Sequence, residues 1–200
     1  MSDVLYSSRT PGREGPLAEL AEHYSRLDML KTRLDSLRPL PPEAVKNLRD
    51  DMVLRYTYHS NAIEGNTLTL QETKVVLEDG LTIGGRSMHE HLEAVNHREA
   101  IVFLEELAET GSALSEGTLK ELHRPFVDGN GRTARLIMNL ELLRSGFPVV
   151  IIPVDERSAY FENLDRIAAK GDYVPFVEQV CGLVEKSFEP YWFLLSNGER

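Results

Sequence analysis

The sequence predicts an all-α fold, and two observations lead to that class. Apolar residues recur every three or four positions along nearly the whole chain, which is the spacing of one helix face. Capping residues, glycines and prolines divide this pattern into segments of helix length. The 200 residues suit one domain, and a hydrophobic content of 42% is enough to bury a core.

The N-terminal region predicts a disordered start followed by one helix. Residues 1–16 are polar and contain glycine and proline, so we expect disorder there. A helix is predicted over 17–37, within an N-terminal segment, 17–40, that prolines close. Its leucines form two seven-residue series, Leu20, Leu27 and Leu34, and Leu30 and Leu37. This seam favours packing on the chain's own domain, and a homodimer arm is the alternative.

A second helix is predicted from about residue 43 to residue 63, in the segment 41–66. Pro42 suits a first helical turn, where proline's missing N–H costs nothing. Glu43 would follow it at the positive end of the helix dipole. The helix should end at Glu64-Gly65-Asn66, because glycine and asparagine readily adopt the left-handed backbone of a helix cap.

The remaining helices are predicted within 67–195. Thr67 or Thr69 suits the cap of one of them, and Ser115 the cap of another. Asp79-Gly80 and Gly84-Gly85 indicate a loop. The expected helices are 70–77, 87–109, 115–122, 132–144, about 156–169 and 174–195.

Charge and composition exclude several classes of protein. A net charge of −10 argues against a general nucleic-acid-binding protein, which needs a basic face. The longest apolar run, Val149 to Val154 including Pro153, is far shorter than the about 20 residues of a membrane span. The first 16 residues lack the apolar centre of a signal peptide, and the single Cys181 fits a reducing compartment. We therefore expect a cytoplasmic protein without nucleic-acid or membrane partners.

The segment 124–135, which reads RPFVDGNGRTAR, indicates an anion site. It is a tight turn that leads into a helix. Gly129, Asn130 and Gly131 all tolerate positive φ, so their N–H groups are able to converge on an anion. The helix start adds unpaired donors and a partial positive charge.

Charged side chains around this turn extend the prediction. Arg132 and Arg135 are three residues apart and are able to face one site, where guanidinium groups match phosphate oxygens. Asp128 supplies a hard oxygen of the kind that Mg²⁺ prefers. Together they favour a site for a magnesium-bound polyphosphate without a Walker sequence. The alternative is a surface turn with two solvated arginines.

The segment resembles the signature of Fic-domain proteins, His-x-Phe-x-(Asp/Glu)-Gly-Asn-Gly-Arg-x-x-Arg. The matching residues are Phe126, Asp128, Gly129, Asn130, Gly131, Arg132 and Arg135. A second match, residues 60–66, reads SNAIEGN and is similar to the inhibitory helix motif of one class of this family. The resemblance spans roughly residues 43–190 and implies a Fic-type helical bundle.

The resemblance also implies an activity, which is transfer of AMP from ATP to a Ser, Thr or Tyr hydroxyl of a target protein. Asp128 would hold Mg²⁺, and the Gly-Asn-Gly turn would cradle the phosphates. Arg132 and Arg135 would contact the β- and γ-phosphates. Tyr160 matches a stretch near the nucleotide base, although a tyrosine on an apolar helix face also fits a core position.

The second motif implies autoinhibition. Glu64 would pair with Arg135 and compete with the γ-phosphate for the same guanidinium. Ser60 would assist by hydrogen-bonding to the loop. Apart from the resemblance, Ser60 and Glu64 read as an ordinary pair at a helix end.

The chain departs from the family at its catalytic histidine. That residue should stand immediately before Pro125, where this chain has Arg124, and an arginine stays protonated. His123 lies one residue earlier. The stretch 119–124 resembles an earlier helix of the family core, which suggests an internal deletion that joins it to Pro125 and removes the β-hairpin flap. His123 then lies beside the motif by accident or acts as a shifted base.

Three hypotheses therefore stand. The chain is an adenylyltransferase restrained by Glu64, or an inactive, shortened relative that binds nucleotide or a protein partner. The third is a helical interaction protein that uses the seam in 20–37.

Overall fold

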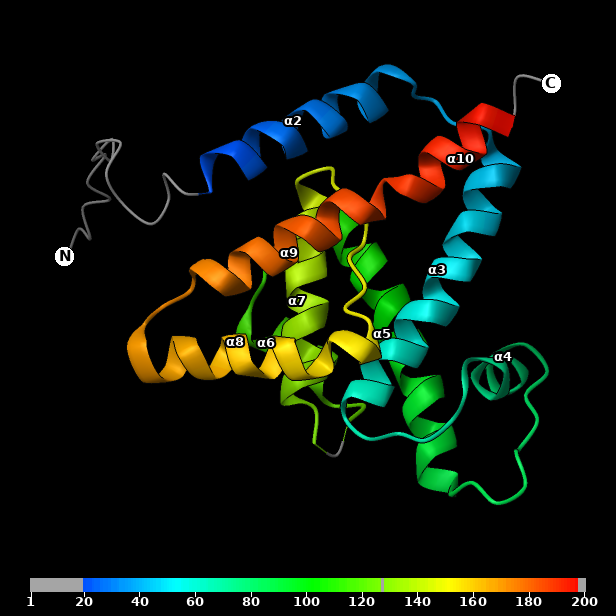
Figure 1. Cartoon of the computed structure of the whole chain (residues 1–200). Coiled ribbons are helices and arrows are strands. Elements are labelled where there is room, and N and C mark those ends of the chain that lie inside the picture. The colour runs from blue at the N-terminus through cyan, green and yellow to red at the C-terminus, as the bar shows by residue number, and fades with distance from the viewer. Residues whose placement is uncertain (1–19, 127, 198–200) are drawn as a thin grey trace.

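A computed structural model describes residues 20–126 and 128–197, and this part of the chain is helical without any strand. The all-α prediction is therefore confirmed. The expectation of disorder in residues 1–16 lies outside the described residues. Figure 1 shows the helices α2 (Ala21–Ser36), α3 (Pro42–Ile63), α4 (Leu70–Glu78), α5 (Met88–Thr110), α6 (Glu116–His123), α7 (Asn130–Arg144), the 3-10 helix η1 (Val154–Glu156), α8 (Arg157–Lys170), α9 (Val174–Ser187) and α10 (Glu189–Asn197).

Local sequence explains most of these boundaries. Thr69 and Ser87 each form a reciprocal capping box with the glutamate three residues later, at the starts of α4 and α5. Gly111 and Gly171 adopt left-handed backbone at the ends of α5 and α8. Of these four signals, the cap at Thr69 was predicted.

The single helix predicted over 174–195 is wrong, because it breaks at Phe188 into α9 and α10. Pro190 provides the physical reason. Proline has no N–H to bond the carbonyl four residues earlier, and it disfavours helical backbone in the residue before it. The break lets the two helices change direction over a buried Phe188.

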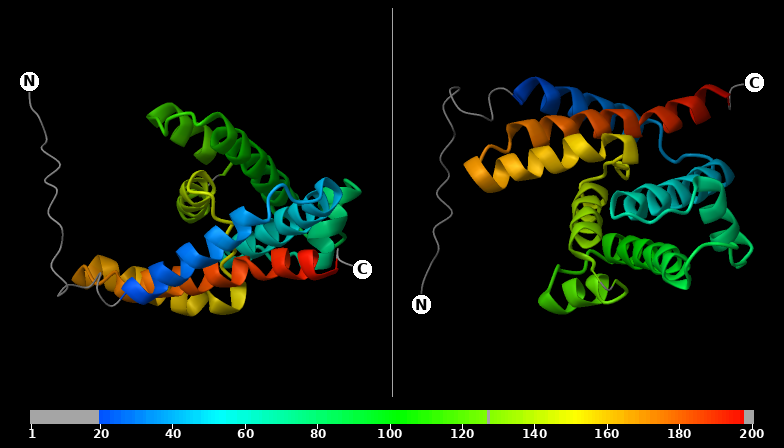
Figure 2. Two further views of the ribbon diagram at one scale, coloured as in Figure 1. Left: turned by 90° about the horizontal axis from the view of Figure 1, so that it is seen from above. Right: turned by 60° about the horizontal axis from the view of Figure 1, so that its bottom comes forward.

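The helices form two groups. In Figure 2, α2, α8 and α9 lie side by side, and α3, α5 and α7 form the second group against them. The chain crosses between the groups through the extended stretch before η1. Asn139 satisfies this stretch without a neighbouring strand, since its side chain accepts from Val150 N at 2.7 Å and donates to Val150 O at 2.9 Å.

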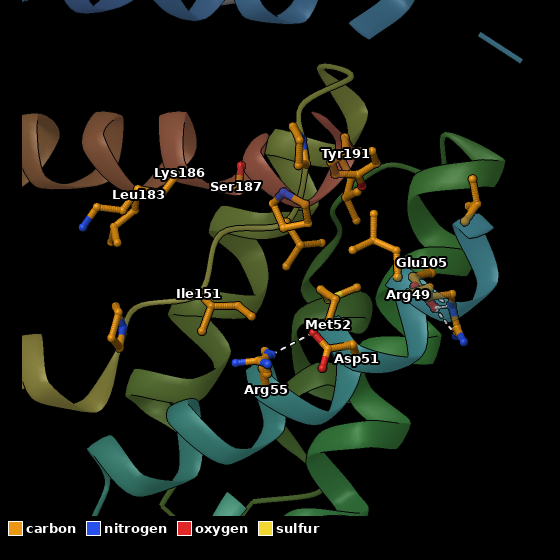
Figure 3. A pocket seen from close by; sticks show the side chains of 17 residues that line it. Arg49, Asp51, Met52, Arg55, Glu105, Ile151, Leu183, Lys186, Ser187 and Tyr191 are labelled. Atoms are coloured by element: carbon orange, nitrogen blue, oxygen red, sulfur yellow. Dashed lines mark hydrogen bonds and ion pairs between the residues drawn. The ribbon is translucent and has the colours of Figure 1, made fainter. Parts of the chain in front are cut away.

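An apolar groove of about 390 Å³ lies between the N-terminal half of α3 and the junction of α9 and α10 (Figure 3). Its apolar lining includes Val45, Leu48, Met52, Ile151 and Tyr191. None of the residues predicted to form the phosphate site lines it. The groove is therefore a feature separate from the candidate site.

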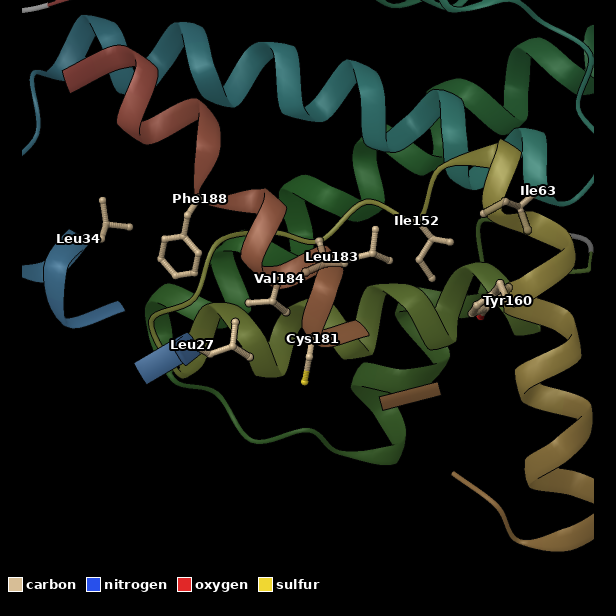
Figure 4. Packing of buried hydrophobic residues seen from close by; sticks show 10 residues of the cluster. Leu27, Leu34, Ile63, Ile152, Tyr160, Cys181, Leu183, Val184 and Phe188 are labelled. Atoms are coloured by element: carbon tan, nitrogen blue, oxygen red, sulfur yellow. The ribbon is translucent and has the colours of Figure 1, made fainter. Parts of the chain in front are cut away.

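The leucine seam of α2 packs inside the molecule. Leu20, Leu27 and Leu34 are buried, and Leu27 and Leu34 join a core cluster with Val184 and Phe188 (Figure 4). This is the packing on the chain's own domain that the spacing favours. No helix in the described ranges has the length and apolar character needed to cross a membrane.

Candidate functional site

The candidate site lies where the C-terminal end of α3, the middle of α5 and the start of α7 meet. The helix α7 begins at Asn130, two residues before the predicted start. Asn130 and Gly131 therefore belong to its first turn, where N–H groups lack partners within the helix. The turn before it, at Asp128 and Gly129, connects α6 to this helix start.

Arg135 is the centre of the site. Its side chain is 2% exposed, and its hydrogen-bond partners among the described residues come from the end of α3. Its Nε donates to Ser60 Oγ at 3.0 Å, and its Nη2 donates to Ser60 O at 2.8 Å and to Glu64 Oε1 at 2.9 Å. Its Nη1 is buried and has no hydrogen-bond partner among the described residues. One donor of a buried guanidinium is thus left for a further anion.

The carboxylate of Glu64 lies directly against the start of α7. A Cβ placed on Gly131 would stand 2.2 Å from Glu64 Oε1 and 3.2 Å from Arg135 Nη1. The Glu64 oxygen therefore occupies the space where the helix start, Gly131 and Arg135 converge. A phosphate oxygen bound to the same donors would need that space.

The glycines of the turn are required for a different reason from the predicted one. Gly129 has a φ of −118° and Gly131 is helical, so neither uses positive φ. A Cβ on Gly129 would lie 2.6 Å from the Cβ of Phe126. Close approach to the Cβ of Phe126 disfavours a side chain at Gly129, and a side chain at Gly131 would require the Glu64 carboxylate to move.

Arg132 lies in the same first turn but faces a different set of partners. Its side chain is 3% exposed, and its Nη1 donates to Glu93 Oε1 at 2.6 Å and to Asn61 Oδ1 at 3.1 Å. Its Nη2 donates to the backbone oxygen of Asp128 at 2.5 Å. The guanidinium also lies 4.8 Å from the centre of the Phe126 ring. Arg132 is thus bonded to α3, α5 and the loop together.

Two further predicted residues lie near Arg135 but not as expected. Ser60 hydrogen-bonds to Arg135 rather than to the loop, because its position on α3 faces the guanidinium. Tyr160 is 4% exposed within a core cluster, and its ring centre lies 5.9 Å from the Arg135 guanidinium. Tyr160 thus packs beneath Arg135, which is the core position that an apolar helix face also allowed.

Asp128 lies exposed beside the helix start. No group of three or more His, Cys, Asp or Glu residues that could hold a metal occurs in residues 20–126 and 128–197. A single carboxylate still fits Mg²⁺ in a nucleotide site, because magnesium is commonly held by one or two carboxylates, phosphate oxygens and water.

His123 and Arg124 end α6 at the mouth of the loop. His123 Nε2 lies 3.3 Å from Asn130 Oδ1, so the imidazole is beside the first turn of α7. Arg124 points elsewhere, since its side chain is 78% exposed and pairs with Glu121 at 3.5 Å. Of these two residues, only His123 reaches the predicted phosphate turn.

Sequence reasoning missed three residues of α5 that contact the site. Glu93, Asn96 and His97 follow the i, i+3, i+4 spacing of one helix face. Glu93 binds Arg132, Asn96 Nδ2 donates to Pro125 O at 2.6 Å, and the His97 ring lies 6.0 Å from that of Phe126. A polar cluster on a helix face that should pack inward is the signal that could have identified them.

His97 is the most strongly perturbed of these groups. It is fully buried, and neither ring nitrogen has a hydrogen-bond partner among the described residues. Burial, reinforced by the positive charges of Arg135 and Arg132, lowers the pKa of His97 to about 3. The imidazole is therefore neutral at physiological pH.

This shift predicts a loss of stability in acid. Between pH 6.5 and 3 the unfolded chain binds a proton at His97 that the folded chain does not, so stability falls as pH falls. The loss attributable to His97 should be about 2–3 kcal/mol between pH 6.5 and 4.5. Urea unfolding at both pH values checks this. His97→Phe should remove the part of the pH dependence that comes from His97. His89→Gln, at an exposed histidine, should leave the pH dependence unchanged. Equal pH slopes of the unfolding free energy in the wild type and His97→Phe would refute the prediction.

Comparisons with known proteins place these features in a family context. No protein-family model matches the sequence. The chain is 30% identical to protein adenylyltransferase fic-1 of Caenorhabditis elegans, over 218 aligned residues that cover 74% of this chain and 43% of that protein. It is 26% identical to protein adenylyltransferase Fic of Drosophila melanogaster, with coverage of 86% and 49%. The chain thus spans about half the length of these curated relatives.

Solved structures share the fold. Fic-1 (residues 134–508) from C. elegans superposes with a TM-score of 0.81 at 28% identity, covering 91% of this chain and 74% of that one. A Fic domain containing signaling protein from Bacteroides thetaiotaomicron gives a TM-score of 0.76 at 23% identity, covering 81% and 93%. The arrangement of helices around the site is therefore one that other chains adopt.

The sequence alignments are longer than the parts of this chain that they cover. Since 74% of 200 residues is about 148, about 70 of the 218 positions aligned with the C. elegans protein have no counterpart here. For the D. melanogaster protein, 242 positions are aligned with about 172 residues, which again leaves about 70. About 70 aligned positions of each relative are therefore without a counterpart in this chain.

Proposed function

Because this chain belongs to the Fic domain family, we propose that it is a protein adenylyltransferase that moves AMP from ATP to a hydroxyl side chain of a target protein. One observation carries the proposal. The buried Arg135 presents an unpartnered Nη1 to Gly131 at the start of α7, and the Glu64 carboxylate lies in the same space. Such a place suits the end of a triphosphate.

The reaction needs few protein groups. The target hydroxyl oxygen attacks the α-phosphorus of ATP, the bond between that phosphorus and the oxygen bridging to the β-phosphate breaks, and pyrophosphate leaves. The first turn of α7 and Arg135 would bind the phosphates and stabilise their charge. His123, beside Asn130, is placed to accept the hydroxyl proton, since a neutral imidazole is a suitable base.

The carboxylate of Asp128 would hold Mg²⁺ at the mouth of the turn. Its exposure leaves its oxygens free of described partners that would compete with the metal. When bound, magnesium would neutralise phosphate charge and help orient the triphosphate.

Glu64 would act as the inhibitor of this site. Its bond to Arg135 Nη2 at 2.9 Å supports that role, because a carboxylate and a phosphate compete for one guanidinium. The side chain is 27% exposed, so it has a route to solvent when a phosphate replaces it. Displacing it does not require α3 itself to unfold.

A second candidate is supported by the departures from the family pattern. Arg124 stands at the base position and points to solvent, and about 70 aligned positions are missing. A deletion between Arg124 and Pro125 would remove the flap that positions a target. The chain would then bind nucleotide or a protein partner without transferring AMP.

Releasing Glu64 tests both candidates. In Glu64→Gly the Kd for Mg-ATP should fall at least about tenfold, because the competing carboxylate is gone. With ATP labelled at the α-phosphate, this variant should label itself or proteins of a cell extract, and the wild type should label much less. Calorimetry and autoradiography measure the two effects.

Two controls separate the outcomes. Glu78→Gly removes a glutamate at the end of another helix, where it pairs only with exposed Lys74, and should behave as wild type. Glu64→Gly/His123→Ala should bind Mg-ATP but fail to label. Binding without labelling in Glu64→Gly would favour the second candidate, and absence of Mg-ATP binding would refute both the transferase and any nucleotide-binding role.

A further inference from the structure

The loop before α7 is held by one face of α5. Asn96 donates to Pro125 O at 2.6 Å, and the His97 ring packs 6.0 Å from Phe126. Glu93, on the same face, reaches the loop through Arg132. These three α5 residues are here called the α5 platform. Asn96 and His97 contact the loop directly, and Glu93 is linked to it through Arg132.

Arg132 is the link between this platform and the turn. Its Nη1 is bonded to Glu93 and Asn61, and its Nη2 to the backbone oxygen of Asp128. Phe126 lies against the guanidinium at 4.8 Å. The side chain of Arg132 is 3% exposed, and these contacts hold it to α3, α5 and the loop together.

Other bonds fix Glu93 itself. Asn66 Nδ2 donates to Glu93 Oε2 at 2.9 Å, and Asn61 Nδ2 donates to the backbone oxygen of Glu93 at 3.3 Å. Both asparagines belong to the segment that carries Glu64. The side chain of Glu93 is only 15% exposed, so its charge is matched mainly by Arg132.

The two arginines of the motif therefore differ. Each arginine keeps one buried nitrogen without a hydrogen-bond partner among the described residues, Nη1 of Arg135 and Nε of Arg132. Arg135 bonds groups at the C-terminal end of α3, and one of them is a carboxylate that has a route to solvent. Arg132 bonds the backbone of the loop and a carboxylate that is itself held in place. Of the two, only Arg135 is bonded to a carboxylate that is free to move into solvent when a phosphate replaces it.

We propose that Arg132 is a positioning residue that ties the phosphate-binding turn to Glu93 of the α5 platform, and that Arg135 alone of the two arginines binds the triphosphate. The inference rests on the proposed function for its ligand. It assigns Glu93 and Asn96 to positioning and replaces the phosphate contact expected for Arg132.

Hydrogen exchange, which needs no nucleotide, tests whether Glu93 and Arg132 hold the turn in place. In the full chain, Glu93→Gln keeps the shape of the side chain but removes its charge, and hydrogen exchange at the Asp128 and Gly129 amides should become about tenfold faster. Asn96→Ala, which leaves Arg132 intact, should have the same effect. Glu99→Gln, at an exposed glutamate of α5, should have none. Unchanged exchange in both Glu93→Gln and Asn96→Ala would overturn the proposal.

Nucleotide binding tests the division of roles. In the Glu64→Gly background, Glu93→Gln and Arg132→Lys should weaken Mg-ATP and AMP by the same factor, about tenfold, and the double variant should be no worse than either. Arg135→Lys should weaken Mg-ATP more than AMP. Tighter Mg-ATP binding in Glu93→Gln, or a selective loss of Mg-ATP in Arg132→Lys, would overturn the proposal. If the Glu64→Gly parent binds no nucleotide, the proposed function fails. The hydrogen-exchange result then still decides whether Glu93 and Arg132 position the turn.

Discussion

Replacing Arg135 by methionine is expected to weaken Mg-ATP binding about 100-fold in the Glu64→Gly background. A guanidinium held by Ser60 in a fixed orientation offers a charge-assisted hydrogen bond to phosphate, and such bonds contribute about 1.5–3 kcal/mol each. Methionine fills a similar volume without charge or donors. Calorimetric titration with Mg-ATP measures the loss.

In the chain with Glu64 present, Arg135→Met should also lower the unfolding free energy by about 2–3 kcal/mol. The Ser60 backbone oxygen would lose the Arg135 donor inside a buried site. The loss stays below that of a fully buried ion pair, because Glu64 is 27% exposed and can turn to water. Urea unfolding measures this effect.

Arg98→Met is the matched control. Arg98 donates to the Leu77 backbone oxygen at 2.9 Å, away from the turn, so its replacement should leave the Kd for Mg-ATP unchanged. If Arg135→Met bound Mg-ATP as tightly as its Glu64→Gly parent, the assignment of Arg135 to the triphosphate would be wrong.

The helices were predictable because their signals are local. Apolar spacing and caps such as Thr69 and Ser87 act within a few residues, and the structure follows them. The break at Phe188 was missed although Pro190, the second residue of α10, signals it. Local patterns thus gave the elements but not this change of direction.

Only the part of the site that two sequence motifs form together could be predicted. The motifs at 60–66 and 124–135 suggested that Glu64 and Arg135 meet, and they lie 2.9 Å apart. The α5 platform carries no such motif, and its contact with the turn depends on how α5 packs against α7. The crowding at Gly131 likewise arises only because Glu64 is brought there from a distant part of the sequence.

Phe188→Ala is expected to cost about 3–5 kcal/mol of unfolding free energy, a large part of the about 5–15 kcal/mol that stabilises a typical domain. Phe188 is fully buried where α9 meets α10 (Figure 4). Its ring stacks on Trp192 at 5.9 Å and meets Phe147 edge-on at 6.4 Å. Alanine would leave a cavity between helices that α2 also covers, and urea unfolding would measure the loss.

Graded variants separate packing from a general defect. Phe188→Leu keeps much of the volume and should cost about 1–2 kcal/mol. Leu81→Ala, at a side chain 59% exposed, should change the unfolding free energy by less than about 0.5 kcal/mol. If Phe188→Ala cost no more than Leu81→Ala, the break between α9 and α10 would not serve the core. If the unfolding free energy instead rises from Phe188→Ala through Phe188→Leu to the wild type, the helix is interrupted at the residue whose burial joins α2, α9 and α10.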